Sequence, residues 1–204
     1  MDAKINRRPL KIRSRAWALE LARAASRAGI GANAISLAGV GFAGLGAAAF
    51  LLTPQGWYWW LVAALAIQLR LLANMLDGLV AVECGRASPK GPLFNEVPDR
   101  IEDVLLLVTA GYVTGMAELG WLAALLALAT AYARLLGGSL SLAQSFAGPM
   151  AKQHRMAALT LAALASAALP GLPVMAVMLV LIAAGTALTF ALRLRRIAHA
   201  LEAR

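Results

Sequence analysis

Long apolar runs, separated by short polar or turn-forming segments, dominate the pattern of this chain. A helix needs roughly 20 mostly apolar residues to cross a bilayer, so 204 residues leave room for about six such helices. No strand-like alternation of apolar and polar residues is evident, and the pattern therefore predicts an all-α integral membrane protein. The six predicted transmembrane helices cover approximately residues 34–52, 57–81, 95–114, 121–136, 156–169 and 174–192.

The composition agrees with a membrane-embedded chain. Hydrophobic residues make up 61% and charged residues 14% of the sequence, whereas a soluble domain carries about 25% charged residues. Mean hydropathy is +0.72. We expect one six-span domain over residues 31–204, preceded by a distinct segment over residues 1–30.

Residues 1–30 are strongly basic and also carry Trp17, Leu19 and Leu21. A basic helix with an apolar stripe is typical of a segment that lies on an anionic membrane surface. We expect an N-terminal interfacial amphipathic helix here. The alternative is a solvated basic tail.

The distribution of positive charge predicts the orientation in the membrane. The turns near Pro54, Glu118 and Gly171 contain no lysine or arginine, whereas both termini and the other two loops do. The positive-inside rule then places both termini at the cytoplasmic face of the inner membrane. We therefore expect the basic residues that give the net charge of +9 to face anionic lipid headgroups, and we expect no nucleic-acid partner.

Residues 74–103 contain most of the acidic side chains, between the second and third apolar runs. Asn74 and Asp77 are three residues apart, and Asn95 and Asp99 are four apart, so each pair lies on one helical face. If these faces oppose each other, four oxygen-bearing side chains converge at the cytoplasmic end of the two helices. Oxygen ligands of this kind suit a hard divalent cation such as magnesium, which would serve a phosphate-bearing substrate.

A purely structural interpretation of the same residues is equally open. Asn95 could cap the start of a helix, and Asp77 followed by Gly78 could end one. Asn33 or Ser36 could cap the first transmembrane helix in the same way.

The spacing over residues 74–99 resembles the signature of the CDP-alcohol phosphatidyltransferase family. That signature reads Asp-x2-Asp-Gly-x2-Ala-Arg-x8-Gly-x3-Asp-x3-Asp, and this chain has Asn74-x2-Asp77-Gly78-x2-Ala81-Val82-x8-Gly91-x3-Asn95-x3-Asp99. All intervals agree. Six spans behind an interfacial helix match the family's architecture, so the resemblance extends over essentially the whole chain.

The resemblance implies a function and a set of residue roles. The family transfers a substituted phosphate from a CDP-alcohol, usually CDP-diacylglycerol, to an acceptor alcohol, releases CMP, and often forms homodimers. By this likeness, one or two Mg²⁺ or Mn²⁺ ions would be held by Asn74, Asp77, Asn95 and Asp99. The nucleotide would lie against Asn74, Asp77, Gly78, Ala81 and Gly91. Asp99 would also take the proton from the acceptor hydroxyl, so the catalytic carboxylates would be Asp99, Asp77 and Asp103.

Three positions depart from the family's pattern, namely Asn74, Asn95 and Val82. The asparagines remove two negative charges, each worth about 4 kcal/mol beside a cation at 4 Å and an effective dielectric of 20, which weakens metal binding. Asp103, one turn beyond Asp99, is the best substitute ligand. Its alternative role is a carboxylate paired with a basic neighbour.

Basic residues near the acidic stretch are candidates for binding substrate phosphate. They are Arg70, Arg86, Arg134, Lys152 and Arg155. Arg70 lies four residues before Asn74, and it either pairs with a carboxylate of this site or contacts phosphate. For Lys152 the alternative is membrane anchoring.

The sequence thus predicts a phosphatidyltransferase of phospholipid biosynthesis, embedded in the membrane together with its lipid substrate. The alternative is a catalytically silent relative that binds lipid or nucleotide as a regulator or partner, and the three departures favour it.

Overall fold

The computed structural model describes residues 16–203, and all of its regular secondary structure over that range is helical. The helices are α1 (Ala16–Arg27), α2 (Ala32–Leu52), α3 (Tyr58–Glu83), α4 (Gly91–Val113), α5 (Ala117–Ser139), α6 (Lys152–Ala168) and α7 (Val174–Glu202). A single 3-10 turn, Thr53–Gln55, joins α2 to α3. The predicted all-α class is confirmed.

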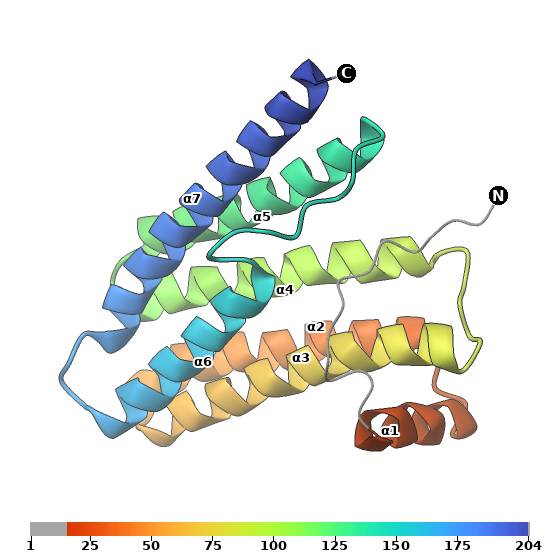
Figure 1. Ribbon diagram of the computed structural model, residues 1–204. Coiled ribbons are helices and arrows are strands. Elements are labelled where there is room, and N and C mark those ends of the chain that lie inside the picture. Colours follow the sequence, from red (N-terminus) through yellow and green to blue (C-terminus); the bar gives the residue numbers. More distant parts are fainter. Residues whose placement is uncertain (1–15, 204) are drawn as a thin grey trace.

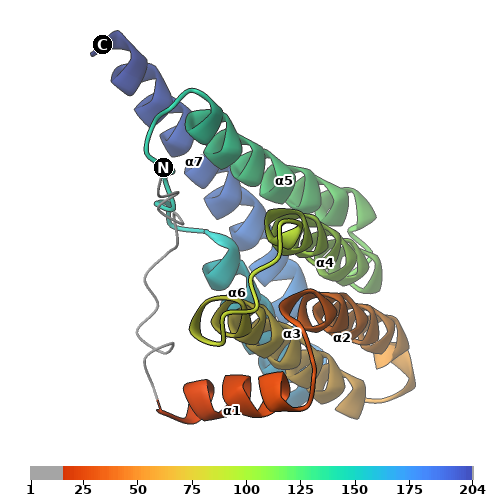
Figure 2. The same cartoon turned by 90° about the vertical axis from the view of Figure 1, so that its right-hand side faces the viewer.

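Helices α2 to α7 form a ring in which each helix packs against two neighbours, in the order α2, α3, α6, α7, α5, α4 and back to α2 (Figures 1 and 2). The core inside this ring is rich in alanine and leucine, and every one of the six helices contributes to it. Small side chains let the helices approach closely, which is the usual basis of helix packing in membranes.

Four of the described helices are long and apolar enough to cross a membrane: α2 with its 3-10 turn, α3, α5 and α7. Helix α4 fails this measure because charged residues fill its first half, and α6 has only 17 residues. Both are members of the ring, and α6 begins beside α4, where Lys152 and Arg155 pair with Asp99 and Asp103 (Figure 1).

Helix α1 lies across one end of the bundle and packs on α3, with Ala18 and Ala22 fully buried (Figure 2). Trp17 and Leu21 remain exposed, at 45% and 40% of their surface. The helix is amphipathic, and its position at a membrane surface stays a prediction. The basic residues before it lie outside the described part of the chain.

Several predicted helix ends differ from those observed. Helix α4 begins at Gly91 and not at Asn95, with Pro92 in its first turn. Helix α3 continues past Asp77 and Gly78 to Glu83. The capping roles suggested for Asn95 and Asp77 are therefore wrong, and all four polar side chains of the motif stand on continuous helix. The N-cap of α2 is Gly31, so Asn33 and Ser36 also do not cap that helix.

Candidate functional site

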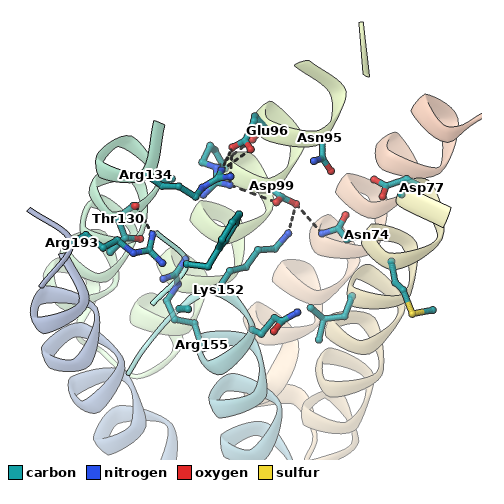
Figure 3. Close-up of a pocket in the computed structure, with 18 residues that line it drawn as sticks. Asn74, Asp77, Asn95, Glu96, Asp99, Thr130, Arg134, Lys152, Arg155 and Arg193 are labelled. Atoms are coloured by element: carbon teal, nitrogen blue, oxygen red, sulfur yellow. Dashed lines mark hydrogen bonds and ion pairs between the residues drawn. The ribbon is translucent and has the colours of Figure 1, made fainter. Parts of the chain in front are cut away.

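The polar positions of α3 and α4 face each other across the ends of these two helices. Asn74 donates a hydrogen bond from Nδ2 to Asp99 Oδ1 at 2.9 Å. Asn74, Asp77, Asn95 and Asp99 all line one pocket of about 220 Å³ (Figure 3). The opposed helical faces inferred from the spacing are thus present.

This pocket, which we call the motif pocket, is lined by residues of five helices and of the α5–α6 loop. Its lining comprises Leu71, Asn74, Met75, Asp77, Gly78, Asn95, Glu96, Asp99, Arg100, Thr130, Ala131, Arg134, Phe146, Ala151, Lys152, Gln153, Arg155 and Arg193. Five of these side chains are cationic and three are anionic. The pocket therefore has a surplus of positive charge, which suits an anionic ligand.

Asp99 is surrounded by cations. The ammonium group of Lys152, the first residue of α6, forms an ion pair with Asp99 Oδ1. Arg100 Nη2 lies 3.5 Å from the other carboxylate oxygen. With the amide of Asn74 added, both oxygens of Asp99 face N–H donors (Figure 3).

Asp77 differs from Asp99 because only one of its two carboxylate oxygens accepts a hydrogen bond within the described chain. Its Oδ2 accepts a hydrogen bond of 2.7 Å from Ser36 Oγ of α2. Its Oδ1 is buried and has no hydrogen-bond partner among the described residues. An unpaired buried acceptor is costly, so a donor group on a ligand in the pocket would be favoured here.

On the opposite wall, Arg134 of α5 binds Glu96 of α4, with Nη2 2.6 Å from both carboxylate oxygens. The same guanidinium donates to Gln144 Oε1 at 3.3 Å and lies 5.4 Å from the centre of the Phe146 ring. These contacts tie the α5–α6 loop to the pocket wall and fix the position of the Arg134 charge.

Beneath the pocket is a group of buried charges, which we call the buried ion network. Arg70 donates from Nε to Glu102 Oε2 at 2.5 Å and from Nη2 to Asp103 Oδ1 at 2.7 Å. Arg155 Nη2 donates to Asp103 Oδ2 at 2.7 Å. Asn74 Nδ2 also donates to Glu102 Oε2 at 2.9 Å, and so links the network to the motif pocket.

The network bears on two of the sequence hypotheses. Arg70 pairs with a carboxylate, although with those of Glu102 and Asp103 and not with the motif residues themselves. Asp103 is 1% exposed, held between two guanidinium groups, and outside the pocket lining. This geometry matches its alternative role, a carboxylate paired with basic neighbours.

Other predicted site residues also lie apart from the pocket. Within residues 16–203, the lining omits Arg70, Ala81, Arg86 and Gly91. Arg86 is exposed in the α3–α4 loop. Ala81 and Gly91 flank this loop, one near the end of α3 and the other at the start of α4.

Some lining residues could not be recognised from the sequence. Arg193 of α7 donates from Nη1 to the Thr130 carbonyl at 2.6 Å and from Nε to the Ala147 carbonyl at 3.1 Å. In the sequence it is simply the first arginine after a long apolar run, where an anchoring residue is expected. Ser36, which lies outside the lining, was expected only as a possible helix cap, because its partner Asp77 is 41 residues away.

The fit of a divalent metal ion can be judged from the oxygens of this site. Magnesium and manganese need several oxygens directed at one point. Both oxygens of Asp99 face cations or N–H groups, and Asn74 directs its N–H groups, not its carbonyl, toward Asp99 and Glu102. No group of three or more His, Cys, Asp or Glu side chains among the described residues is arranged to hold a metal. The residues as arranged do not fit the expected ions.

Comparison with known sequences gives one informative match. Over 83 residues the chain is 37% identical to phosphatidylinositol phosphate synthase of Mycolicibacterium smegmatis. The match covers 41% of this chain but only 36% of that protein's length. No model of a known protein family matches the chain.

Solved structures match over most of the chain. The crystal structure of Mycobacterium tuberculosis phosphatidylinositol phosphate synthase with CDP-DAG bound has a TM-score of 0.74 and 20% identity, covering 88% of this chain and 92% of that one. The same enzyme in complex with manganese and citrate gives 0.74 at 20% identity, over 88% of each chain, and its apo form gives 0.69 at 20% identity, over 86% of this chain and 93% of that one. At this identity the likeness shows the fold.

The fold and the pocket at the end of its bundle define a helical membrane protein with the architecture of phosphatidylinositol phosphate synthase. This chain is a relative of that synthase, matched in sequence over 83 residues and in fold over most of its length.

Proposed function

We propose that this protein binds a CDP-linked alcohol, with CDP-diacylglycerol as the foremost example, and transfers its substituted phosphate to an acceptor alcohol with release of CMP. The observation that carries the proposal is the motif pocket. It gathers the polar positions of the family motif and five cationic side chains at one end of a membrane bundle. A dianionic diphosphate matches the surplus of positive charge.

The side chains of the pocket divide between binding and reaction. Lys152, Arg134 and Arg155 supply positive charge for the diphosphate. The free oxygen of Asp77, next to Gly78, accepts a hydrogen bond from a donor on the nucleotide. Asn95 is exposed at the mouth, where it offers an amide to a polar group of either substrate.

In the transfer step, the acceptor hydroxyl attacks the β-phosphorus, and the bond from this phosphorus to the bridging oxygen of CMP breaks. Asp99 takes the hydroxyl proton. Negative charge builds up on the phosphate oxygens and on the leaving CMP as these bonds change. The fixed cations around Asp99 stabilise this charge as it develops.

The proposed setting is the cytoplasmic face of the inner membrane, with six helices spanning the bilayer and α1 lying at the interface. Charged α4 and short α6 complete the six, because the other helices of the ring shield their polar ends. The motif pocket then opens where a lipid with a water-exposed headgroup can reach it. From the family likeness we also propose a homodimer.

The deciding experiment measures CMP release by the purified protein in detergent, with CDP-diacylglycerol and a panel of acceptor alcohols, in the presence and absence of Mg²⁺ or Mn²⁺. Asp99→Ala is expected to lower the rate by about a hundredfold or more, the usual contribution of a catalytic base. Glu118→Gln changes an exposed carboxylate at the other end of the bundle and is the matched control, expected to keep the wild-type rate.

A second function is favoured by the contacts of Asp99. Because this carboxylate is paired with Lys152 and Arg100, the pocket could hold a CDP-lipid without turning it over, as a lipid- or nucleotide-binding regulator does. Absence of CMP with every acceptor, together with retained CDP-diacylglycerol binding, would establish this role in place of transfer.

A further inference from the structure

Lys152 occupies an unusual position for a lysine at the end of a membrane bundle. It is the first residue of α6, yet its side chain reaches into the motif pocket and pairs with Asp99 of α4 (Figure 3). Its side chain is only 23% exposed. A lysine that merely anchors the chain extends toward water and headgroups, so this side chain does something else.

The asparagine at position 74 completes the same arrangement. Both N–H groups of its amide are used, one on Asp99 and one on Glu102, each at 2.9 Å. Its carbonyl oxygen faces Gly39 of α2, where an added Cβ would lie 3.2 Å away. An aspartate at this position would place a third carboxylate against Asp99 and Glu102, whereas the amide binds both.

Nearby carboxylates are compensated in the same manner. Glu102 and Asp103 each pair with Arg70, and Asp103 also pairs with Arg155. Asp99, Glu102 and Asp103 thus each pair with a cation of the chain itself, and the buried carboxylate oxygens left without a hydrogen-bond partner among the described residues are Asp77 Oδ1 and Glu102 Oε1. A divalent ion beside Asp99 would therefore meet the ammonium group of Lys152 and not an open anionic site.

We infer that the Lys152 ammonium group takes the place of a divalent cation in this pocket, so that the protein binds a diphosphate without Mg²⁺ or Mn²⁺. The inference rests on the proposed binding of a CDP-alcohol. It explains why asparagine stands at positions 74 and 95, where the family's motif has aspartate. With Lys152 as the source of positive charge, the carboxylates that would bind a metal are not needed. The pocket keeps its anionic ligand but exchanges a dissociable metal for a fixed ammonium.

The first test measures metal binding directly. Chelator-treated protein in detergent is titrated with Mn²⁺, and the free ion is followed by electron paramagnetic resonance. We expect the wild-type protein to leave the free Mn²⁺ signal undiminished up to the protein concentration. Depletion of the signal by one or more ions per chain would overturn the inference.

A variant with Asn74→Asp, Asn95→Asp and Lys152→Met restores the family's carboxylates and removes the ammonium. Provided that it elutes and unfolds like the wild type, it is expected to deplete free Mn²⁺. If the folded variant also leaves the signal unchanged, Lys152 and the asparagines are not what excludes the metal, and the inference fails. The wild-type titration does not depend on this variant.

The second test measures calorimetric binding of CDP, the soluble part of the proposed substrate, in EDTA and in Mg²⁺. The wild-type Kd is expected to be the same in both. Lys152→Met should weaken binding in EDTA by about ten- to a hundredfold, the value of one charged hydrogen bond. Lys90→Met, in the exposed α3–α4 loop, is the matched control and should leave the Kd unchanged.

Tight CDP binding in Mg²⁺ that is lost in EDTA would overturn the inference, and so would an unchanged Kd in Lys152→Met. If CDP binds under neither condition, the proposed CDP-alcohol function fails. The Mn²⁺ titration then still decides the metal question, so the two failures are distinguishable.

Discussion

Arg70 and Arg155 are the largest fully buried side chains among the described residues. A guanidinium group cannot lose its charge in a protein, so it must be paired where water is absent. Arg70 pairs with Glu102 and Asp103, and Arg155 pairs with Asp103. These pairs connect α3, α4 and α6 directly beneath the motif pocket. The network holds the helices that carry Asn74, Asp99 and Lys152.

Removing one member of this network should therefore be costly. Arg70→Leu leaves two carboxylates of α4 without their main partner, and we expect a loss of about 3 to 5 kcal/mol in the free energy of unfolding. The measurement is the midpoint of thermal unfolding in detergent. Arg86→Leu, an exposed arginine of the α3–α4 loop, is the control. Equal midpoints for the two variants would show that the network contributes little to stability.

The convergence of Asn74, Asp77, Asn95 and Asp99 could be predicted because helical spacing fixes which residues share a face. The residues that pair with them could not be predicted from the sequence. Lys152 is 53 residues from Asp99, and Arg155 is 52 from Asp103. Contacts at such separations depend on which helices become neighbours in the ring, and apolar periodicity does not encode that order.

At the level of helices, the closest approach of two backbones at the glycines of the described chain is between α4 and α5. A Cβ added to Gly111 would lie 2.6 Å from the Cα of Gly120, so at this point the two backbones touch. Close backbone contact between small residues is a common way to join membrane helices. This contact joins α4 and α5 near the turn between them, and the Glu96–Arg134 ion pair joins the same two helices at the pocket wall.

Gly111→Ala should push α4 and α5 apart, since backbone atoms cannot move aside as a flexible side chain can. We expect a loss of about 1 to 3 kcal/mol in the free energy of unfolding, the usual cost of overpacking. Gly44→Ala in α2 is the matched control, because a Cβ there meets nothing within 4 Å. Thermal unfolding of both variants in detergent provides the comparison. A Gly111→Ala midpoint no lower than that of Gly44→Ala would contradict the close contact.

The helices themselves were largely predictable, because each apolar run is long and bounded by glycine, proline or charge. The residues at which the helices begin and end were harder to predict. Asn95 looked like a cap, but Gly91 and Pro92 start α4 one turn earlier, which moves Asn95 and Asp99 onto regular helix. The polar character of α4 also follows from its place in the ring, where neighbouring helices supply partners for charges that lipid could not accept.

Within residues 16–203, most of the charged side chains lie toward one end of the molecule, and the turns at the other end contain no lysine or arginine. The motif pocket and the α3–α4 loop with Arg86 and Lys90 lie at one end, together with α1. The other end has the turns near Thr53 and Gly171 (Figure 1). Helix α3, which connects the two ends, is 26 residues or roughly 39 Å long, enough to cross the hydrocarbon core of a bilayer.

This asymmetry makes the orientation testable with the chain's single cysteine. Cys84 follows α3 directly, at the pocket end, and is partly exposed. If the positive-inside rule holds, a membrane-impermeant maleimide should leave Cys84 unmodified in intact bacterial host cells and modify it in inverted vesicles. The control is Cys84→Ala with Gln55→Cys, an exposed position in the opposite turn, which should react in intact cells. The reverse labelling pattern would place the motif pocket on the outer face. A CDP-alcohol made in the cytoplasm would not reach the pocket there, so this result would also remove the proposed function.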